Sequence, residues 1–257
     1  MRTAIAVFCK TPGFSPIKTR LGDEIGDADA EEFYRLSVLA IDEILVQVAE
    51  KLEQRVDIYW AVGEQGALNN SIWKSHKRIW TGEGGLGEKI HHVQEELLKL
   101  HEQVIIIGSD SPQITADYLI TAIDRLYEKK LEGVIGPCRD GGFVLLGTKR
   151  MIQRSILTKV TYSENDTLLQ LTTLLKQANH NFSMLTGLGD VDQYDDLILL
   201  LNDFLQLGSI LQPRQLYLYH WVQRLLISRR FITEMKSFRI GEKPEDRMLA
   251  QMGSKSN

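Results

Sequence analysis

Short apolar runs rich in β-branched residues alternate along this sequence with segments of helical periodicity. Residues 3–9 and 56–62 are apolar runs of strand length, and residues 104–108 are apolar throughout. A strand that is covered on both faces has such a run, whereas a half-exposed strand alternates with period two. Residues 28–52 instead place apolar side chains three or four positions apart, as one helix face does. This alternation predicts a three-layer α/β/α domain with a mostly parallel central sheet.

The remaining elements follow the same rhythm. Further strands are expected over residues 78–81, 133–137, 143–148 and 182–185, and further helices over residues 86–100, 115–130, 163–177 and 193–205. Three helix starts offer side-chain caps: Asp27 or Asp29 for the helix 28–52, Thr115 for the helix 115–130, and Ser163 with Asp166 as a capping box.

Charge is divided unevenly along the 257 residues. Residues 1–204 contain 21 basic and 30 acidic residues, whereas residues 205–257 contain nine basic and four acidic residues. We therefore expect a domain over residues 1–204 and a basic helical extension over residues 205–257. An acidic body argues against general nucleic-acid binding, which needs a basic face.

The extension carries an apolar stripe at helical spacing beside several arginines. The stripe consists of Leu211, Leu218, Trp221, Val222, Leu225 and Leu226, and the arginines are Arg214, Arg224, Arg229 and Arg230. Three interpretations stay open: packing on the body or on a homodimer partner, a helix that docks on a membrane surface or another partner, and acceptor recognition.

Neither a membrane span nor an exported domain is indicated. Apolar runs such as residues 197–201 are too short to cross a bilayer. The first ten residues lack the small-residue cleavage site of a signal peptide. Cys9 and Cys138 are too few for a disulfide framework and are expected to be small core residues, so a cytoplasmic location is expected.

A basic loop follows the first predicted strand. Residues 10–21 contain a Pro-Gly turn and then Lys18 and Arg20, and such cations can hold phosphate oxygens. The loop is not a Walker A motif, because Pro12 and Ile17 stand where that motif requires glycine. A solvated basic loop is the alternative.

Carboxylate loops follow three later strands. Asp110 follows the fourth strand, Asp140 follows the fifth, and Asp190 or Asp192 follows the last. Ligands of open α/β sheets bind at the carboxyl ends of strands, and carboxylate oxygens are preferred ligands of Mg²⁺ and Mn²⁺. Each aspartate alone could equally be a turn or capping residue. Together with the basic loop they indicate a site for a metal-chelated di- or triphosphate, with Lys18 and Arg20 stabilising the leaving group.

Other residue types add less. The pair Gly141-Gly142 would let a ligand approach the backbone closely, or it simply forms a hairpin turn. The histidines lack zinc-ligand spacing and are assigned structural or surface roles, including the adjacent His91 and His92. No G-x-S-x-G elbow occurs, which argues against a serine hydrolase.

Five segments occur in an order that resembles one known family. They are FCKTPGFSPIKTRLG at 8–22, GGLGEK at 84–89, IGSDSP at 107–112, GPCRDGGF at 136–143 and DVD at 190–192. They resemble the glycosyltransferase-A-like "radical-SAM/selenodomain-associated transferase" family of the nucleotide-diphospho-sugar transferase superfamily, over about residues 1–204. That family is similar to guanylyltransferases of F420 cofactor synthesis and, more distantly, of the molybdenum cofactor.

This resemblance implies a GT-A fold that binds a nucleotide or nucleotide sugar with Mg²⁺ or Mn²⁺. It places Lys10, Gly13, Lys18 and Arg20 around the phosphates, Leu86 and Gly87 beside the base or ribose, and Asp110, Asp140 and Asp192 or Asp190 at the metal. Two departures stand out. Lys89 replaces the usual arginine of the family, and residues 160–164 differ from its Trp-Ser-Thr-like segment.

The expected function is metal-dependent transfer from an activated nucleotide to an unknown acceptor, with catalytic roles for Lys18, Arg20 and Asp110. Glycosyl transfer from a nucleotide-diphospho-sugar is placed first. Nucleotidyl transfer that releases pyrophosphate from an NTP is the alternative, because KTRL at 18–21 resembles the KSRL of the F420 guanylyltransferases. A catalytically inactive nucleotide-binding module is a further alternative.

Overall fold

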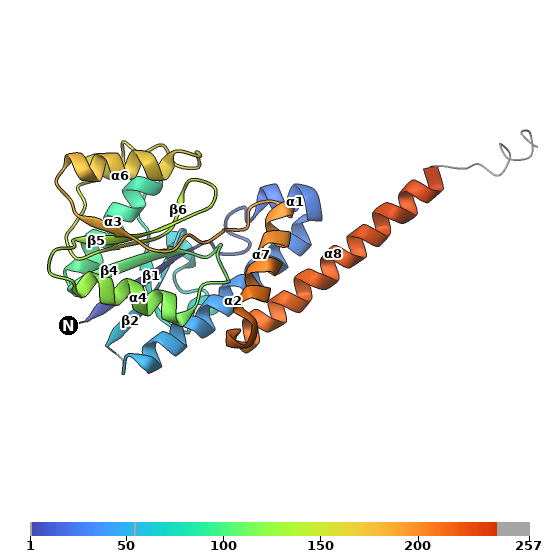
Figure 1. Ribbon diagram of the computed structural model, residues 1–257, viewed down its shortest axis with the longest axis horizontal. Coiled ribbons are helices and arrows are strands. Elements are labelled where there is room, and N and C mark those ends of the chain that lie inside the picture. Colours follow the sequence, from blue (N-terminus) through green and yellow to red (C-terminus); the bar gives the residue numbers. More distant parts are fainter. Residues whose placement is uncertain (1, 54, 241–257) are drawn as a thin grey trace, which may run out of the picture. The chain divides into compact units, whose positions relative to one another are not determined.

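A seven-stranded sheet forms the centre of the structure, a computed structural model that describes residues 2–53 and 55–240, with side chains as far as Arg229 (Figure 1). The strand order is β3-β2-β1-β4-β6-β5-β7, and β6 runs antiparallel to both of its neighbours while the other pairs are parallel. The strands are β1 (Thr3–Cys9), β2 (Val56–Val62), β3 (Lys77–Trp80), β4 (Gln103–Gly108), β5 (Gly133–Pro137), β6 (Phe143–Thr148) and β7 (Phe182–Met184).

Helices cover both faces of this sheet, which confirms the predicted three-layer α/β/α fold. The helices are α1 (Thr19–Ile25), α2 (Asp27–Lys51), α3 (Leu86–Leu98), α4 (Ala116–Tyr127), α5 (Arg154–Leu157), α6 (Thr167–Gln177), α7 (Tyr194–Leu207) and α8 (Pro213–Ile240). Short 3₁₀ turns occur at η1 (Gln65–Ala67), η2 (Ser71–Trp73) and η3 (Gly208–Ile210). Residues of α2 and α4 pack on one face, and residues of α3, α5 and α6 pack on the other.

Strand β1 shows why a buried strand could be predicted from its apolar sequence. Ile5 and Val7 point into one core cluster, while Ala4 and Ala6 point into the other, and all four are fully buried. Because successive side chains of a strand point to opposite faces, a strand covered on both sides must be apolar at every position. The small alanines leave room for α3, whose Val93 is buried in the same cluster.

The main differences from the predicted elements lie at helix starts. Helix α2 has Gly26, with φ 89°, as its N-cap, and Asp27 lies in the first turn, where the helix dipole favours a carboxylate. Helix α6 begins at Thr167, and Ser163 has φ 64°, so the predicted capping box is wrong. Thr115 caps α4 as predicted, accepting a hydrogen bond from the Tyr118 N–H. The short helices α1 and α5 were not predicted.

The topology brings several loops to one edge. β1, β2, β4, β5 and β7 run in the same direction, so the segments that follow them meet at the carboxyl edge of the sheet. Asp140 follows β5 within a tight hairpin, because β6 returns antiparallel beside it. The predicted convergence of the basic loop and the carboxylate loops at one sheet edge therefore has its structural basis.

The chain divides into two compact units, Met1–Leu218 and Tyr219–Asn257. The position expected for the start of the extension, residue 205, lies inside α7, and the first turns of α8 belong to the first unit. There the buried Gln215 donates from Nε2 to the carbonyl oxygens of Pro112 and Ile114, both at 2.9 Å. Within the second unit α8 continues to Ile240, and the side chain of Arg230 lies outside the described residues.

Among the helices described, none combines the length and apolar character needed to span a bilayer.

Candidate functional site

A cleft of about 600 Å³ opens at the carboxyl edge of the sheet. Its walls come from the ends of β1 and β4, the loop 10–18, the start of α3 and the loop before α7. The charged residues in the lining are Lys10, Lys18, Arg20, Lys89, Asp110 and Asp192. Four cations and two carboxylates give this lining an excess of positive charge, which suits an anionic ligand better than a neutral one.

The loop 10–18 is fixed at its start by buried aromatic residues. The Tyr34 hydroxyl on α2 accepts from the Lys10 N–H and donates to the Lys10 carbonyl, both at 2.8 Å. The Trp73 indole N–H donates to the Thr11 hydroxyl at 3.0 Å, and Glu64 accepts from the Thr11 N–H. Sequence reasoning missed these supporting residues, because nothing in the local pattern shows which distant aromatic meets the loop.

Lys18 is the centre of the site. It adopts the left-handed conformation, φ 48°, immediately before α1, and its side chain is 5% exposed. Its ammonium lies 2.7 Å from Oδ1 of Asp110 and 2.9 Å from Oδ1 of Asp192, and it also donates to the Val191 carbonyl. Burial alone would lower the pKa of Lys18, but the two carboxylates outweigh it and raise that pKa above its ordinary value.

Hydrogen bonds of the backbone hold the segments that carry Asp110 and Asp192 in place. The Val191 N–H donates to the Asp110 carbonyl at 3.0 Å, and the Asp192 N–H donates to the Asp196 carboxylate at 2.9 Å. Their side chains are 43% and 44% exposed, so the carboxylates remain accessible from the cleft. The structure thus brings together the predicted residues Lys18, Asp110 and Asp192.

The other predicted phosphate-binding cations surround this centre. Arg20, in the first turn of α1, lies 3.9 Å from Oδ2 of Asp192, and its side chain is 62% exposed. Lys10 and Lys89 line the same cleft, so the position at which the chain departs from the family pattern still provides a cation. Leu86 is 42% exposed in the cleft wall, where it could contact a base or ribose.

Four predicted glycines do not line the cleft. Gly13 lies in an exposed turn with φ 80°, and Gly87 is buried where a Cβ would overlap the carbonyl oxygen of Leu157. Gly141, at φ 92°, packs still more closely on the backbone of Asn165, while Gly142 donates its N–H to Asp140 Oδ1 at 2.8 Å. At Gly87 and Gly141, the close approach of another backbone segment explains why a residue without a Cβ is needed.

Asp140 and Asp190 form a group separate from Asp110 and Asp192. Ligand atoms of Cys138, Asp140 and Asp190 all lie within 4.8 Å of one another, and the Cys138 thiol donates to Asp190 at 3.2 Å. Burial raises the pKa of Asp190 to about 6, and the nearby carboxylates add to this shift while the thiol opposes it. The loop 189–192 therefore contributes a carboxylate to each group, with Asp192 beside Lys18 and Asp190 beside Cys138.

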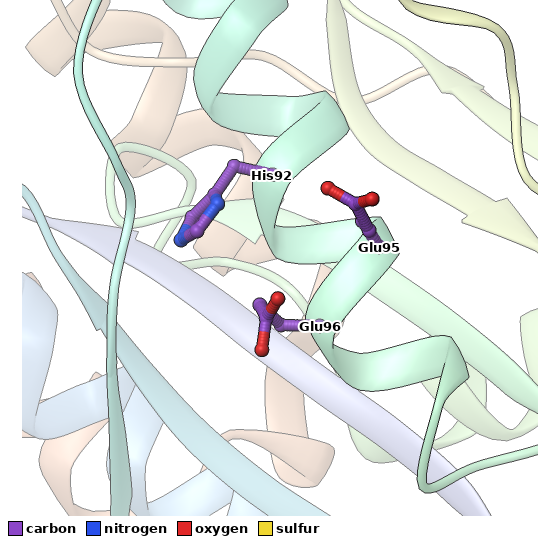
Figure 2. A group of neighbouring side chains, drawn as sticks. All are labelled: His92, Glu95 and Glu96. Carbon is purple, nitrogen blue, oxygen red and sulfur yellow. The ribbon is translucent and has the colours of Figure 1, made fainter.

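A third possible metal-binding group lies on the surface of α3 (Figure 2). His92, Glu95 and Glu96 lie on neighbouring turns of the helix, with ligand atoms within 4.8 Å of one another. Glu96 is paired with Lys99 at 2.6 Å, and none of the three lines the cleft. This group is an ordinary helix-surface arrangement.

The cleft also contains polar residues that the sequence did not reveal. Thr81, at the end of β3, is 2% exposed, and its hydroxyl has no hydrogen-bond partner within the described structure. Ser109 and Ser163 contribute further hydroxyl-bearing residues to the lining. The signal available in the sequence was their position after a strand or before a helix. That signal is weak, because serine and threonine are common in any loop.

Comparison with known proteins adds the fold relationship. Residues 44–164 match the model of a family described as an uncharacterized protein conserved in bacteria (DUF2064). No curated protein matches the sequence significantly. Among solved structures, a protein of Desulfovibrio desulfuricans G20 that is named provisionally as a nucleotide-diphospho-sugar transferase matches with a TM-score of 0.75 and 22% identity, over 89% of this chain and 98% of that chain.

Two other solved structures are more distant. A CMP:2-keto-3-deoxy-manno-octonic acid synthetase complexed with CTP has a TM-score of 0.49 and 13% identity, over 80% of this chain and 98% of that one. A 4-diphosphocytidyl-2C-methyl-D-erythritol synthase of Anaerococcus prevotii DSM 20548 has a TM-score of 0.48 and 11% identity, over 80% and 96%. The fold assignment rests on the Desulfovibrio protein, which confirms the predicted fold class.

Proposed function

We propose that this chain is a metal-dependent transferase that acts on an activated nucleotide bound in the cleft. The carrying observation is the convergence of Asp110 and Asp192 on the buried ammonium of Lys18, at the wall of a cleft with three further cations. A metal-chelated polyphosphate has a positive metal ion and negative phosphate oxygens. The carboxylates of this wall could bind the metal ion, and its cations could bind the phosphate oxygens. The order of the five sequence segments supports placing the chain in the radical-SAM-associated transferase family.

The donor set of Asp110 and Asp192 fits a divalent cation. Both carboxylates already direct an oxygen to one positive charge, and both are open to the cleft. Mg²⁺ and Mn²⁺ prefer such oxygen ligands and keep several waters or phosphate oxygens as the others. When bound, the cation would neutralise charge on the phosphates during transfer.

The cations of the chain would act on the departing phosphates. Lys18 is rigidly held by its two carboxylates, whereas Arg20 and Lys10 lie in exposed or partly exposed positions from which they could close on a phosphate. In glycosyl transfer, the bond from the anomeric carbon to the diphosphate oxygen breaks as an acceptor oxygen bonds to that carbon. The acceptor loses its proton, and a nucleoside diphosphate leaves with the bonding electron pair.

Nucleotidyl transfer is the second candidate, and the grouping of cations on one loop favours it. Lys10, Lys18 and Arg20 lie within eleven residues at the end of β1 and line one cleft, an arrangement that suits a pyrophosphate leaving group. Here the acceptor oxygen attacks the α-phosphorus, and the bond to the bridging oxygen breaks. Pyrophosphate then leaves in place of a nucleoside diphosphate.

A product assay separates these reactions. The full chain would be incubated with a panel of NTPs and nucleotide sugars, with and without Mn²⁺, and released nucleoside diphosphate and pyrophosphate would be measured together with nucleotide-induced thermal shifts. We expect a Mn²⁺-dependent shift that is lost in Asp110→Asn and kept in Asp117→Asn, whose side chain is 82% exposed on α4.

Each outcome has a defined meaning. Nucleoside diphosphate release supports glycosyl transfer, and pyrophosphate release supports nucleotidyl transfer. A metal-dependent shift without either product would favour the inactive binding module. An unchanged shift in Asp110→Asn would remove Asp110 from the metal site, and no shift with any nucleotide would overturn the proposal.

A further inference from the structure

The first turns of helix α8 lie in a stretch of the chain that lacks acidic residues. Residues 204–233 contain no aspartate or glutamate, although the 257 residues have 34 of them and an even spread would place about four here. The same stretch contains Arg214, Arg224, Arg229 and Arg230, and the four acidic residues of the C-terminal extension all come later. Residues 204–233 are therefore a concentrated basic segment in an otherwise acidic chain.

One face of α8 is buried. Gln215, Leu218, Val222 and Leu225 are each at most 9% exposed and recur every three or four positions, so they share one side of the helix. In the first unit, Gln215 fixes this side through its bonds to two backbone carbonyls. The other three residues belong to the apolar stripe expected from the sequence, and their burial makes them unavailable to another molecule.

The opposite, outer face of α8 consists of Leu216, Tyr217, His220, Arg224 and Ile227, all of them exposed. The first unit contributes Leu216 and Tyr217, which are 44% and 52% exposed, and the second unit contributes Ile227, which is 69% exposed. Positions 217, 220, 224 and 227 are three or four residues apart, so they follow one another along one side of the helix. This face therefore combines large apolar side chains with basic ones.

Two arginines of this segment can contact another molecule. Arg214, in the first turn of α8, and Arg224, on the outer face, are both exposed. Neither forms an ion pair with a carboxylate among the residues whose side chains are described. Glu43 of α2 contacts the backbone N–H of Arg214, at 2.7 Å, and not its guanidinium. Their positive charges thus remain uncompensated beside the exposed apolar side chains.

An anionic lipid bilayer complements both properties of this surface. Its negative surface potential attracts arginines that lie within a Debye length, and its headgroup region accepts apolar and aromatic side chains from a helix that lies along it. Tyrosine suits this boundary because its ring is apolar and its hydroxyl is polar.

A protein partner fits these observations less well. Strong protein contacts centre on side chains that fill pockets, whereas the outer face of a helix is convex. A second copy of this chain, related by a two-fold axis, would bring the same surface against itself and place Arg224 near a like charge. The charge and shape of the outer face therefore favour a lipid surface.

We propose that the outer face of α8 binds an anionic bilayer, with Arg214 and Arg224 at the lipid headgroups and Leu216, Tyr217 and Ile227 inserted among them. The helix lies along the membrane surface, in agreement with the finding that none of the described helices could span a bilayer. This contact goes beyond the proposed function and does not depend on what the cleft binds.

Co-sedimentation of the full chain with vesicles, without nucleotide or metal, tests the proposal. One set of vesicles would be phosphatidylcholine alone, and the other an equal mixture of phosphatidylcholine and phosphatidylglycerol. We expect binding to the mixed vesicles that is about tenfold or more stronger than to the neutral ones, and that falls as NaCl is raised from about 0.1 M to 1 M.

Two pairs of variants separate charge from insertion. Arg214→Gln/Arg224→Gln should weaken binding to the mixed vesicles about tenfold or more, whereas Arg78→Gln/Arg154→Gln, at exposed positions on β3 and α5, should not. Leu216→Ser/Ile227→Ser should also weaken binding. Its control is Leu100→Ser/Leu169→Ser, which removes two exposed leucines after α3 and on α6.

The outcomes are distinct from those of the product assay. Salt-sensitive binding that is lost in both outer-face variants, each shown to be folded by circular dichroism, supports the lipid contact even if no nucleotide is ever used. Equal sedimentation with neutral and mixed vesicles, or wild-type binding in Arg214→Gln/Arg224→Gln, would overturn it. A dimer in analytical ultracentrifugation that dissociates in Leu216→Ser/Ile227→Ser, without vesicle binding by the wild type, would assign the outer face to a second copy and overturn it as well.

Discussion

The ammonium of Lys18 lies 2.9 Å from Oδ1 of Asp192, across a separation of 174 residues in the sequence. This pair joins the loop after the first strand to the loop before α7, and Asp110 completes the junction from β4. Since the side chain of Lys18 is almost fully buried, the junction is a fixed part of the cleft wall. The basic loop and the two loops that carry Asp110 and Asp192 therefore hold one another in position.

Lys18→Met should reduce kcat/KM by about 100-fold or more, since one preorganised charge at a transferring phosphate contributes on that scale. Loss of the ammonium would also leave Asp110 and Asp192 close together without their shared cation. Steady-state kinetics on the donor identified by the product assay would measure this, beside a thermal melt to show folding. Lys99→Met, at an exposed position immediately after α3, is the control. Wild-type kinetics in Lys18→Met would exclude Lys18 from catalysis.

Tyr34→Phe should loosen the basic loop without removing any charge from it. The substitution deletes the hydroxyl that bonds both the N–H and the carbonyl of Lys10, at a position 3% exposed. We expect a loss of about 1–3 kcal/mol in the free energy of unfolding, because the N–H and the carbonyl of Lys10 lose the partner that this buried hydroxyl provides. Urea denaturation would measure it, with Tyr217→Phe, half exposed on α8, as the matched control. Equal stability of the two variants would contradict the assigned role.

Gly87→Ala should destabilise the fold. This effect is expected from packing, whereas the family resemblance implies a nucleotide-binding role for the segment that contains Gly87. The added Cβ would overlap the Leu157 carbonyl where α3 meets α5, at a typical cost of about 1–3 kcal/mol for overpacking. Gly85→Ala is the control, because its Cβ would meet the flexible end of the Glu88 side chain at 3.3 Å. Differential scanning calorimetry should show a lower Tm for Gly87→Ala alone.

Asp57 should make the fold sensitive to acid. Burial would raise the pKa of Asp57, but Lys77, His101 and Arg2 outweigh it and hold that pKa below its ordinary value. The unfolded chain therefore binds this proton more readily than the folded chain. The stabilisation is fully present above the unfolded pKa of about 3.9 and is lost as pH falls through the folded pKa.

The measurement is the Tm of wild type and Asp57→Asn between pH 6 and pH 3. The variant should be less stable at pH 6, and the difference should shrink as pH falls below about 4. A difference that stays constant over this range would show that Asp57 acts through packing alone. Asp23→Asn, on the exposed face of α1, provides the charge-matched control.

Sequence reasoning succeeded where the deciding information was local. β1 was predicted to its observed bounds because Thr3 and six apolar residues precede a loop with a Pro-Gly turn. The structure brings Lys18 and Asp110 together, and both were singled out by their positions after strands. Helix α1 was missed because it has seven residues and no side-chain cap. The close approach of Gly87 to Leu157 could not be predicted for a different reason: this contact joins segments that are distant in the sequence.

The loop 189–192 shows the same limit within four residues. Asp190 and Asp192 were equivalent candidates in sequence, yet Asp192 lines the cleft while Asp190 lines a separate cavity of about 200 Å³. Which side each carboxylate takes depends on partners elsewhere, Lys18 for one and Cys138 for the other. Spacing alone carries no information about those partners.

The contact of Gln215 with the carbonyl oxygens of Pro112 and Ile114 determines where this chain can be cut. A fragment ending at residue 204 would retain all five motif segments but leave both carbonyls without this amide, two and four residues beyond Asp110. A fragment ending at residue 218 would keep it. The shortest fragment that keeps this support is consequently longer than the segment that contains the five motifs. Replacing or shortening α8 before residue 218 would remove a contact that supports the loop carrying Asp110.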